Sequence, residues 1–332
     1  MAGIKYMLAR IVQLDYKSMF SVAKDVSKKS GRSFIGICVD MTRCGLKYQA
    51  GYNDYREFEF YNLTPAQRET YLTRGRNNDI ISRYNDKAYF DSFNDKIKFN
   101  GIFSDFLGRE WIDLNSADEK SFHDFMERNP KIIAKPIDGE GGKGIDKYDL
   151  ADYADSGEIL RLARERGQTL VEAFVVQHSE MNRLYPDSVN TMRMFTFCKD
   201  GKGHFLQAIL KIGNGGVIDN FSSGGMYTFA DENGVVDVPA IDKADVLHSK
   251  HPVTGTDIIG FRIPLYDEAV KFVERAAEVV PQVAYVGWDV AISENGPVLI
   301  EGNCFPGVFQ RRASLSRDKT GVIPKYREYM DI

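Results

Sequence analysis

Alternating apolar residues near the C-terminal end of the chain predict a β-hairpin. Val, Leu and Ile recur over 285–292 and again over 297–303, and the turn-forming residues Glu294, Asn295 and Gly296 lie between the two runs. If these three residues form the loop, Ser293 pairs with Pro297 and Asp289 lies opposite Glu301.

Asn303 would follow Glu301 on the same face of this hairpin, because side chains alternate along a strand. Two carboxylates so close together repel each other unless a cation neutralises them. A set of oxygen donors that includes carboxylates suits Mg²⁺. We therefore expect Asp289, Glu301 and Asn303 to bind a metal, and we expect replacement of either acid to leave the fold intact. The plainer alternative is a solvated hairpin with two ordinary acids.

A glycine-rich segment lies about 150 residues upstream. The run 130–136 reads as a strand that ends near Lys135, and a second short strand begins at Ile145. A Walker A loop is excluded because glycine follows Lys143, and the dinucleotide fingerprint fails because no helix pattern follows it. The remaining interpretation is a flap whose backbone N–H groups face phosphate. Its proposed binding residues are Gly141, Gly142, Lys143 and Gly144, although a glycine-rich turn can also be only a turn.

Four further patterns predict helices. Thr64 and Pro65 signal a helix start, and Ser116 with Glu119 forms a possible capping box. A stripe with Ala269, Phe272, Val273 and Ala276 predicts a helix over 265–280. The N-terminal residues 1–20 favour an amphipathic surface helix, with docking to a membrane or a membrane-bound partner as the alternative.

Composition narrows the class of protein. The 332 residues are 43% hydrophobic and 27% charged with a net charge of −4, which is typical of a soluble globular protein without affinity for nucleic acid. The apolar runs are too short for a membrane span, and charged residues interrupt any signal-peptide core. Four scattered cysteines and five scattered histidines suggest neither disulfides nor zinc, so a cytoplasmic location is expected.

Taken together, these motifs resemble the ATP-grasp superfamily. A lysine before a glycine-rich flap, a later apolar strand with Glu172, and an Asp then Glu-x-Asn set follow one another in the order typical of that superfamily. Further segments resemble the sugar-transfer-associated ATP-grasp family, related to the α-L-glutamate ligases and found beside polysaccharide biosynthesis enzymes. These segments are Asp40–Tyr48, Asp54–Phe58, Asn94–Lys96, Asn190–Arg193, Asp219–Gly225 and Asn303–Gly307.

The resemblance implies an α+β ATP-grasp fold that holds the nucleotide between two lobes. It divides the chain into an N-terminal helical and mixed region (1–110), a central lobe with the flap (111–175) and a C-terminal lobe with the metal site (176–332). It also implies roles for individual residues. Lys96 and Lys135 would contact the α and β phosphates, and Glu172, Phe174 and Val175 would lie along the adenine.

Several related ligases place an arginine two residues before the first metal-binding acid, where this chain has Gly287. The resemblance therefore assigns the missing cation to Arg193 or Lys211, near the transferred phosphate. The segment with Asn220 reads as a catalytic loop beside that phosphate, or as an ordinary turn.

The first functional hypothesis is an ADP-forming, ATP-grasp carboxylate–amine ligase that uses ATP and Mg²⁺ and proceeds through an acyl phosphate. The implied substrates are a small-molecule carboxylate and an amine, sugar-linked or amino-acid-like, in polysaccharide or cell-surface biosynthesis, with glycan-biosynthesis proteins as possible partners. The alternatives are a kinase on the same scaffold and a nucleotide-binding accessory protein of a glycosyltransfer complex. The sequence does not define the oligomeric state.

Overall fold

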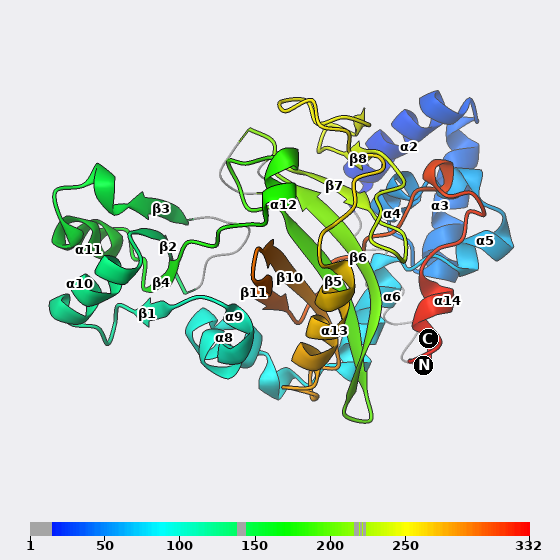
Figure 1. Ribbon diagram of the computed structural model, residues 1–332. Helices are drawn as coiled ribbons and strands as arrows, with labels where there is room; N and C mark the ends of the chain where they lie inside the picture. Colours follow the sequence, from blue (N-terminus) through cyan, green and yellow to red (C-terminus); the bar gives the residue numbers. More distant parts are fainter. Residues whose placement is uncertain (1–14, 138–143, 216–218, 220, 222–223) are drawn as a thin grey trace. The chain divides into compact units, whose positions relative to one another are not determined.

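The computed structural model describes residues 15–137, 144–215, 219, 221 and 224–332, and Figure 1 shows their helices and strands. The chain divides into two compact units, Met1–Arg83 with Gly307–Ile332 and Tyr84–Pro306. The C-terminal tail thus belongs with the N-terminal helices. The three consecutive regions predicted from the sequence stay a prediction.

The first unit is helical and has its own core. Aromatic and aliphatic side chains such as Ile37, Tyr55, Phe60 and Tyr71 are buried together. Its elements are α2 (Tyr16–Ser30), α3 (Phe34–Tyr48), α4 (Tyr52–Glu57), η1 (Phe60–Asn62), α5 (Pro65–Glu69), α6 (Arg74–Tyr84), η5 (Ala313–Leu315) and α14 (Ile323–Tyr326).

Two helix starts in this unit bear on the sequence predictions. Helix α5 begins as expected, because the Thr64 hydroxyl accepts a hydrogen bond from the Gln67 N–H and Pro65 occupies the first turn. Helix α2 is capped by the carboxylate of Asp15. The helix predicted over 1–20 falls largely on residues 1–14, which lie outside the described residues.

The second unit contains a small antiparallel sheet with two helices packed against it (Figure 1). Its strand order is β1-β4-β2-β3, from β1 (Trp111–Asp113), β2 (Lys131–Lys135), β3 (Asp146–Asp149) and β4 (Leu170–Ala173). The helices are α10 (Glu119–Arg128) and α11 (Ser156–Glu165), and η3 (Leu150–Asp152) follows β3. The strands predicted on either side of the glycine-rich segment are therefore confirmed.

The capping box predicted at Ser116 is wrong. Helix α10 begins two residues later, because the carboxylate of Asp118 accepts the hydrogen bond from the Ser121 N–H. Asp and Ser cap helices about equally well, so local preference alone did not separate the two positions.

The large sheet of the second unit has the order β11-β10-β5-β6-β7-β8-β9. Its strands are β5 (Thr191–Lys199), β6 (Lys202–Ile212), β7 (Met226–Phe229), β8 (Ala240–Ile241), β9 (Leu247–His248), β10 (Tyr285–Ser293) and β11 (Gly296–Asn303). The accompanying helices are η2 (Lys87–Tyr89), α7 (Asp91–Asn94), α8 (Lys96–Ile102), α9 (Ser104–Leu107), α12 (Ser179–Leu184) and α13 (Tyr266–Ala277). Antiparallel sheets with helices in separate segments confirm the predicted α+β class.

One face of the large sheet forms the main core. Met192, Leu210, Trp288 and Leu299 project from that face into a cluster that also includes the apolar side of α13. The predicted apolar stripe of α13 is buried, although the helix ends at Ala277 and not at Val280. Because side chains alternate, the residues between these core positions project from the opposite face.

The hairpin β10–β11 brings Asp289 opposite Glu301, as the sequence predicts, but its loop is not the predicted one. Ser293 pairs with Gly296, so the loop has two residues and not three. A register shift beyond Asp289 leaves Ile300 without a partner in the ladder, because Val290 pairs with Leu299. The bulge compensates for the shorter loop.

Candidate active site

Five polar residues project from the sheet face opposite the main core. Arg193 lies on β5, Lys211 on β6, Asp289 on β10, and Glu301 and Asn303 on β11. Arg193 and Glu301 pair directly with Asp289 in the two adjoining strands. The strand order thus collects side chains that are up to 110 residues apart in the sequence. We call this group, with Thr191 and Asp219, the Asp289 cluster.

Asp289 is buried and ion-paired. Arg193 donates to Oδ1 at 2.5 Å from Nε and to Oδ2 at 3.0 Å, and Lys211 Nζ lies 3.0 Å from Oδ2. Burial alone would raise the pKa of the Asp289 carboxyl, but Arg193 and Lys211 hold it well below its usual range. Asp289 therefore stays ionised. Its loss would remove the nearest partner of two buried cations, Arg193 and Lys211, which would keep only Glu301 and Asp219 at 4.0 Å. We therefore expect this replacement to destabilise the fold, although the sequence predicts that the fold tolerates it.

Glu301 differs from Asp289 although the two lie opposite each other. Desolvation raises the pKa of Glu301 and the charge of Asp289 raises it further, even though 46% of the Glu301 side-chain surface is exposed. Asn303 donates to Glu301 Oε1 at 3.2 Å and to the Gly287 carbonyl at 3.3 Å. The predicted repulsion between the two acids is thus present, and Glu301 keeps oxygens open to a further cation.

Gly287 explains how Arg193 reaches this position. A Cβ atom on Gly287 would lie 3.2 Å from Arg193 Cδ and 3.3 Å from one guanidinium nitrogen. The arginine on β5 therefore occupies the space beside position 287. A side chain at position 287 would require Arg193 and also Pro306, whose Cβ lies 3.0 Å away, to shift by a few tenths of an ångström.

Asp219 extends the cluster beyond the strands. It accepts hydrogen bonds from the Thr191 N–H at 2.9 Å and the Thr191 hydroxyl at 2.5 Å, and its Oδ1 lies 4.0 Å from Lys211 Nζ. Lys211 thus lies between two carboxylates, Asp219 and Asp289. The neighbouring Asn220, predicted to be catalytic, lies outside the described residues.

A second group of ions lies on the small sheet. Glu172 on β4 accepts from Lys135 Nζ at 2.7 Å, from Arg109 at 2.8 Å and from the Asn100 amide at 2.7 Å. We call these four residues the Glu172 cluster. Burial would raise the pKa of Glu172, but Arg109 and Lys135 outweigh it and lower the pKa to about 2. The ionised carboxylate is therefore fully matched by donors.

The remaining predicted nucleotide residues adjoin the small sheet. Lys96 at the start of α8 donates to the Ile137 carbonyl at 2.8 Å, close to the beginning of the flap. Phe174 follows β4 and lies under Lys147 Nζ, 4.3 Å from the ring centre, and the half-buried Val175 comes next. The structure does not bring Phe174 or Val175 into either ion cluster.

The described end of the flap is fixed by one buried amide. Gln168 donates to the Gly144 carbonyl at 2.9 Å and to Asp146 at 2.6 Å, and it accepts from the Tyr148 hydroxyl at 3.0 Å. Gly144 has a φ of 73°, which favours glycine. The other proposed flap residues, Gly141, Gly142 and Lys143, lie outside the described residues.

Sequence reasoning missed Asn100, Arg109 and Gln168. Asn100 and Arg109 lie in or just after short helices whose patterns carry no functional signal, and they meet Glu172 only through the tertiary fold. Asp219 lies in the Asp219–Gly225 segment that resembles the family, but none of its neighbours in the sequence indicated that it would face Lys211. Only the tertiary fold makes these residues neighbours of their partners.

Within the described part of the chain, no three or more His, Cys, Asp or Glu residues are grouped closely enough to hold a metal. The Asp289 cluster offers two facing carboxylates and an amide, a small oxygen set of the kind that Mg²⁺ completes with water and phosphate. The donors therefore fit Mg²⁺ bound together with a phosphate ligand, and not a fully protein-ligated metal.

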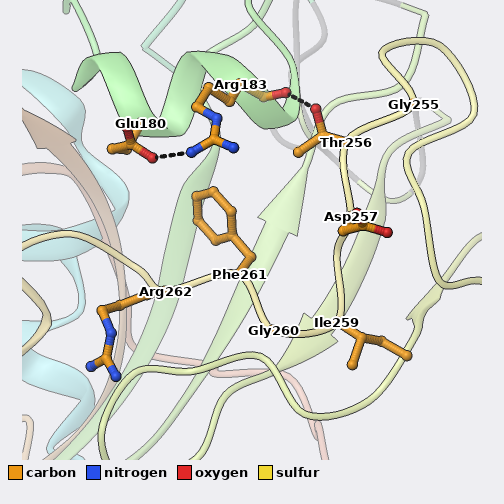
Figure 2. Close-up of a pocket in the computed structure, with 9 residues that line it drawn as sticks. All are labelled: Glu180, Arg183, Gly255, Thr256, Asp257, Ile259, Gly260, Phe261 and Arg262. Atoms are coloured by element: carbon orange, nitrogen blue, oxygen red, sulfur yellow. Dashed lines mark hydrogen bonds and ion pairs between the residues drawn. The ribbon is translucent and has the colours of Figure 1, made fainter.

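A separate open pocket lies between α12 and residues 255–262 (Figure 2). Its volume is about 450 Å³, and its lining includes Glu180, Arg183 and Asp257. Glu180 and Arg183 form an ion pair at 2.7 Å, and the Thr256 hydroxyl donates to the Arg183 carbonyl. No residue of either ion cluster lines this pocket, so it is distinct from the candidate active site.

Comparison with known protein families gives one match that covers most of the chain. The family model described as sugar-transfer associated ATP-grasp matches residues 75–312. No curated protein matches the chain.

Solved structures give weaker similarities. The ATP-grasp ligase PsnB, complexed with precursor peptide PsnA2 and AMPPNP, has a TM-score of 0.41 and 14% identity over 70% of this chain and 57% of its own. D-cycloserine synthetase DcsG has a TM-score of 0.39 and 17% identity, over 75% of this chain and 70% of its own. D-alanine–D-alanine ligase from Bacillus anthracis has a TM-score of 0.43 and 13% identity, over 76% of this chain and 73% of its own. The chain thus spans less than two thirds of PsnB, and these similarities are too low to support an argument about activity.

Proposed function

The chain belongs to the sugar-transfer-associated ATP-grasp family, which confirms the predicted resemblance and fold, and we propose that it is an ATP-dependent carboxylate–amine ligase. The observation that carries this proposal is the Asp289 cluster, in which three carboxylates and two cations face one site on a rigid sheet. Such a site matches a reaction in which a negatively charged phosphoryl group moves between oxygens with help from Mg²⁺.

In the proposed first step, a substrate carboxylate oxygen attacks the γ-phosphorus of ATP and ADP leaves, which gives an acyl phosphate. An amine then attacks the acyl carbon, phosphate leaves, and the nitrogen loses a proton to give the amide. Arg193 and Lys211 would neutralise charge on the transferred phosphoryl group. Asp289, Glu301 and Asn303 would hold Mg²⁺, whose charge would further reduce the repulsion between phosphate and carboxylate.

The Glu172 cluster supports the assignment of Lys135 to the ATP phosphates. An ammonium group has three N–H donors, and the contact with Glu172 uses one of them. Lys135 is therefore fixed in place while it can still donate to a phosphate oxygen. Lys96 and the flap residues 141–144 would complete the phosphate site, and Glu172, Phe174 and Val175 would border the adenine.

The finer assignments follow from the family description and the resemblance. We propose a sugar-linked or amino-acid-like carboxylate, an amine acceptor and a role in polysaccharide or cell-surface assembly, with glycan-biosynthesis proteins as partners. The four cysteines are unpaired, which agrees with a reaction in the cytoplasm. Among the described residues, no helix is long and apolar enough to cross a membrane.

Incubation with ATP, Mg²⁺, a panel of carboxylates and hydroxylamine tests the proposal. We expect hydroxamate together with equal amounts of ADP and free phosphate, because an acyl phosphate is trapped by this nucleophile. The Asp289→Asn variant should form none, whereas Asp105→Asn, the same change on an exposed helix, should behave as wild type. A stable phosphorylated alcohol, formed at full rate without any amine, would identify a kinase and contradict the ligase.

A further inference from the structure

Helices α2 and α3 carry a charge opposite in sign to that of the chain as a whole. Residues 16–48 contain seven lysines and arginines against two aspartates, a net charge of +5, while the whole chain has a net charge of −4. The other residues together therefore carry −9. Positive charge is thus concentrated in one pair of helices of the first unit.

Both aspartates of this segment are already paired. Asp25 bonds Lys29 at 3.3 Å within α2, and Asp40 bonds the buried Arg68 at 2.7 Å. The remaining cations are exposed, and although Lys47 also pairs with Glu69 at 3.4 Å, together they leave a positively charged surface on the two helices. These exposed cations include Lys17, Lys24, Lys28, Arg32 and Arg43.

The same two helices expose large apolar side chains. Phe20 and Phe34 are both more than 40% exposed, and their rings lie 6.1 Å apart, so the apolar surface crosses from α2 to α3. Ile35 is 74% exposed and lies one helical turn from the exposed Val39. Tyr16 and Leu46 are exposed as well.

Apolar and basic residues also share one row of α2. Tyr16, Phe20, Lys24 and Lys28 follow one another at intervals of four, and all four are exposed. A row that begins with aromatic rings and continues with lysines combines burial in acyl chains with attraction to anionic headgroups. Aliphatic residues such as Ile35 and Val39 offer no stacking surface for bases, so a nucleic acid fits this face less well.

We propose that the α2–α3 face docks on an anionic lipid bilayer surface. The exposed aromatic and aliphatic side chains enter the boundary between headgroups and acyl chains, and the surrounding lysines and arginines contact the headgroup phosphates. The other residues together carry net negative charge, which the same surface repels, so the attraction to the lipid comes from these two helices. The inference is independent of the proposed ligase activity.

Flotation of the full chain with vesicles tests the proposal. We expect binding to phosphatidylcholine vesicles that contain phosphatidylglycerol, little binding to phosphatidylcholine alone, and loss of binding as salt is raised. Lys24→Gln/Lys28→Gln/Arg43→Gln should weaken binding by about tenfold or more. Ile35→Ser/Val39→Ser should weaken it by a similar factor through lost apolar contact.

Two control variants make the same changes on exposed residues of the second unit. Lys120→Gln/Lys202→Gln/Lys271→Gln removes three charges, and Val246→Ser/Val253→Ser removes two apolar side chains. Both should bind as wild type, and circular dichroism of every variant verifies the fold. Absence of binding to the mixed vesicles would overturn the proposal. Wild-type binding by both α2–α3 variants would also overturn it. The same holds if the two control variants lose as much binding as the α2–α3 variants do.

Discussion

The Glu172 cluster and the Asp289 cluster are built from the same residue types but have opposite net charge. One carboxylate meets two cations around Glu172, whereas three carboxylates meet two cations around Asp289. A site with excess positive charge attracts phosphate, and a site with excess negative charge attracts a metal ion. The ratio of acids to bases, more than the residue types, therefore distinguishes the two proposed roles.

The clusters also differ in how well their carboxylates are matched. Glu172 has three donors and a pKa lowered to about 2, so it is a saturated structural partner. In the other cluster Asp289 and Asp219 each accept short hydrogen bonds, while Glu301 accepts, among the described residues, only from Asn303 and has a raised pKa and an exposed face. An acid with few donors beside well-matched acids is the arrangement that a bound cation would complete.

The largest expected effect separates Asp289 from Glu301. We expect Asp289→Asn and Glu301→Gln each to lower ATP turnover by about 10³-fold, because each removes a carboxylate from the proposed metal site. Only Asp289→Asn should also lower the free energy of unfolding, by about 3 kcal/mol, since it leaves Arg193 and Lys211 without their buried partner. Glu301→Gln should stay within about 1 kcal/mol of wild type. Steady-state kinetics and urea unfolding measure the two quantities.

Near-wild-type turnover in both variants would contradict the metal assignment. Equal stability losses in the two variants would instead show that Asp289 and Glu301 are held equally strongly within the Asp289 cluster. Asp105→Asn serves as the control for both measurements.

The next effect concerns the acid dependence of stability. The pKa of Glu172 is lowered from 4.5 to about 2 in the folded protein, so its stabilising contribution is complete above the unfolded pKa and is lost as pH falls toward 2. This contribution is about 3 kcal/mol. Glu172→Gln should be less stable than wild type at pH 7 but should show a flatter stability profile between pH 5 and 2.

Urea unfolding at several pH values measures this slope. The exposed Glu232→Gln variant should reproduce the wild-type profile. A Glu172→Gln profile as steep as that of wild type would mean that other carboxylates dominate the acid response.

The smallest expected effect tests how Arg193 is held. A methyl group at position 287 would lie 3.0 Å from Pro306 Cβ and 3.2 Å from Arg193 Cδ. Because the arginine side chain is the more adaptable of the two, Gly287→Ala should shift the guanidinium and lower kcat by about tenfold, with little change in stability. Gly101→Ala is the matched control, because its added Cβ would meet no atom within 4 Å. Unchanged kcat in Gly287→Ala would show that the close approach has no bearing on turnover.

The sequence predicted the parts of the fold that local chemistry determines. The strands flanking the flap, the cap at Thr64 and the apolar stripe of α13 follow from turn residues and periodicity. The pairing of Asp289 with Glu301 was also predicted, but from a three-residue loop that the structure does not have. The cap of α10 was misplaced because Ser116 and Asp118 offer similar hydrogen bonds to the backbone.

The candidate site could be predicted only in part, because its electrostatics depend on strand order. Nothing near Asp289 in the sequence indicates that Arg193 and Lys211 would neutralise it, and nothing near Glu172 indicates Asn100 or Arg109. These partners come from segments that are 63 to 96 residues apart. Such pairings require the three-dimensional arrangement, which a single sequence read by local pattern does not provide.

The bulge at Ile300 has a consequence for the comparison of related sequences. Its extra residue shifts the pairing register between the turn of the hairpin and the acids of the site. A change in loop length can therefore be offset at the bulge, and Glu301 can stay opposite Asp289. An alignment would ordinarily place an insertion or deletion of this hairpin in the loop at Glu294–Asn295. A related hairpin with a two-residue loop and no bulge would be one residue shorter, and its gap would belong at position 300, where this backbone carries one unpaired residue.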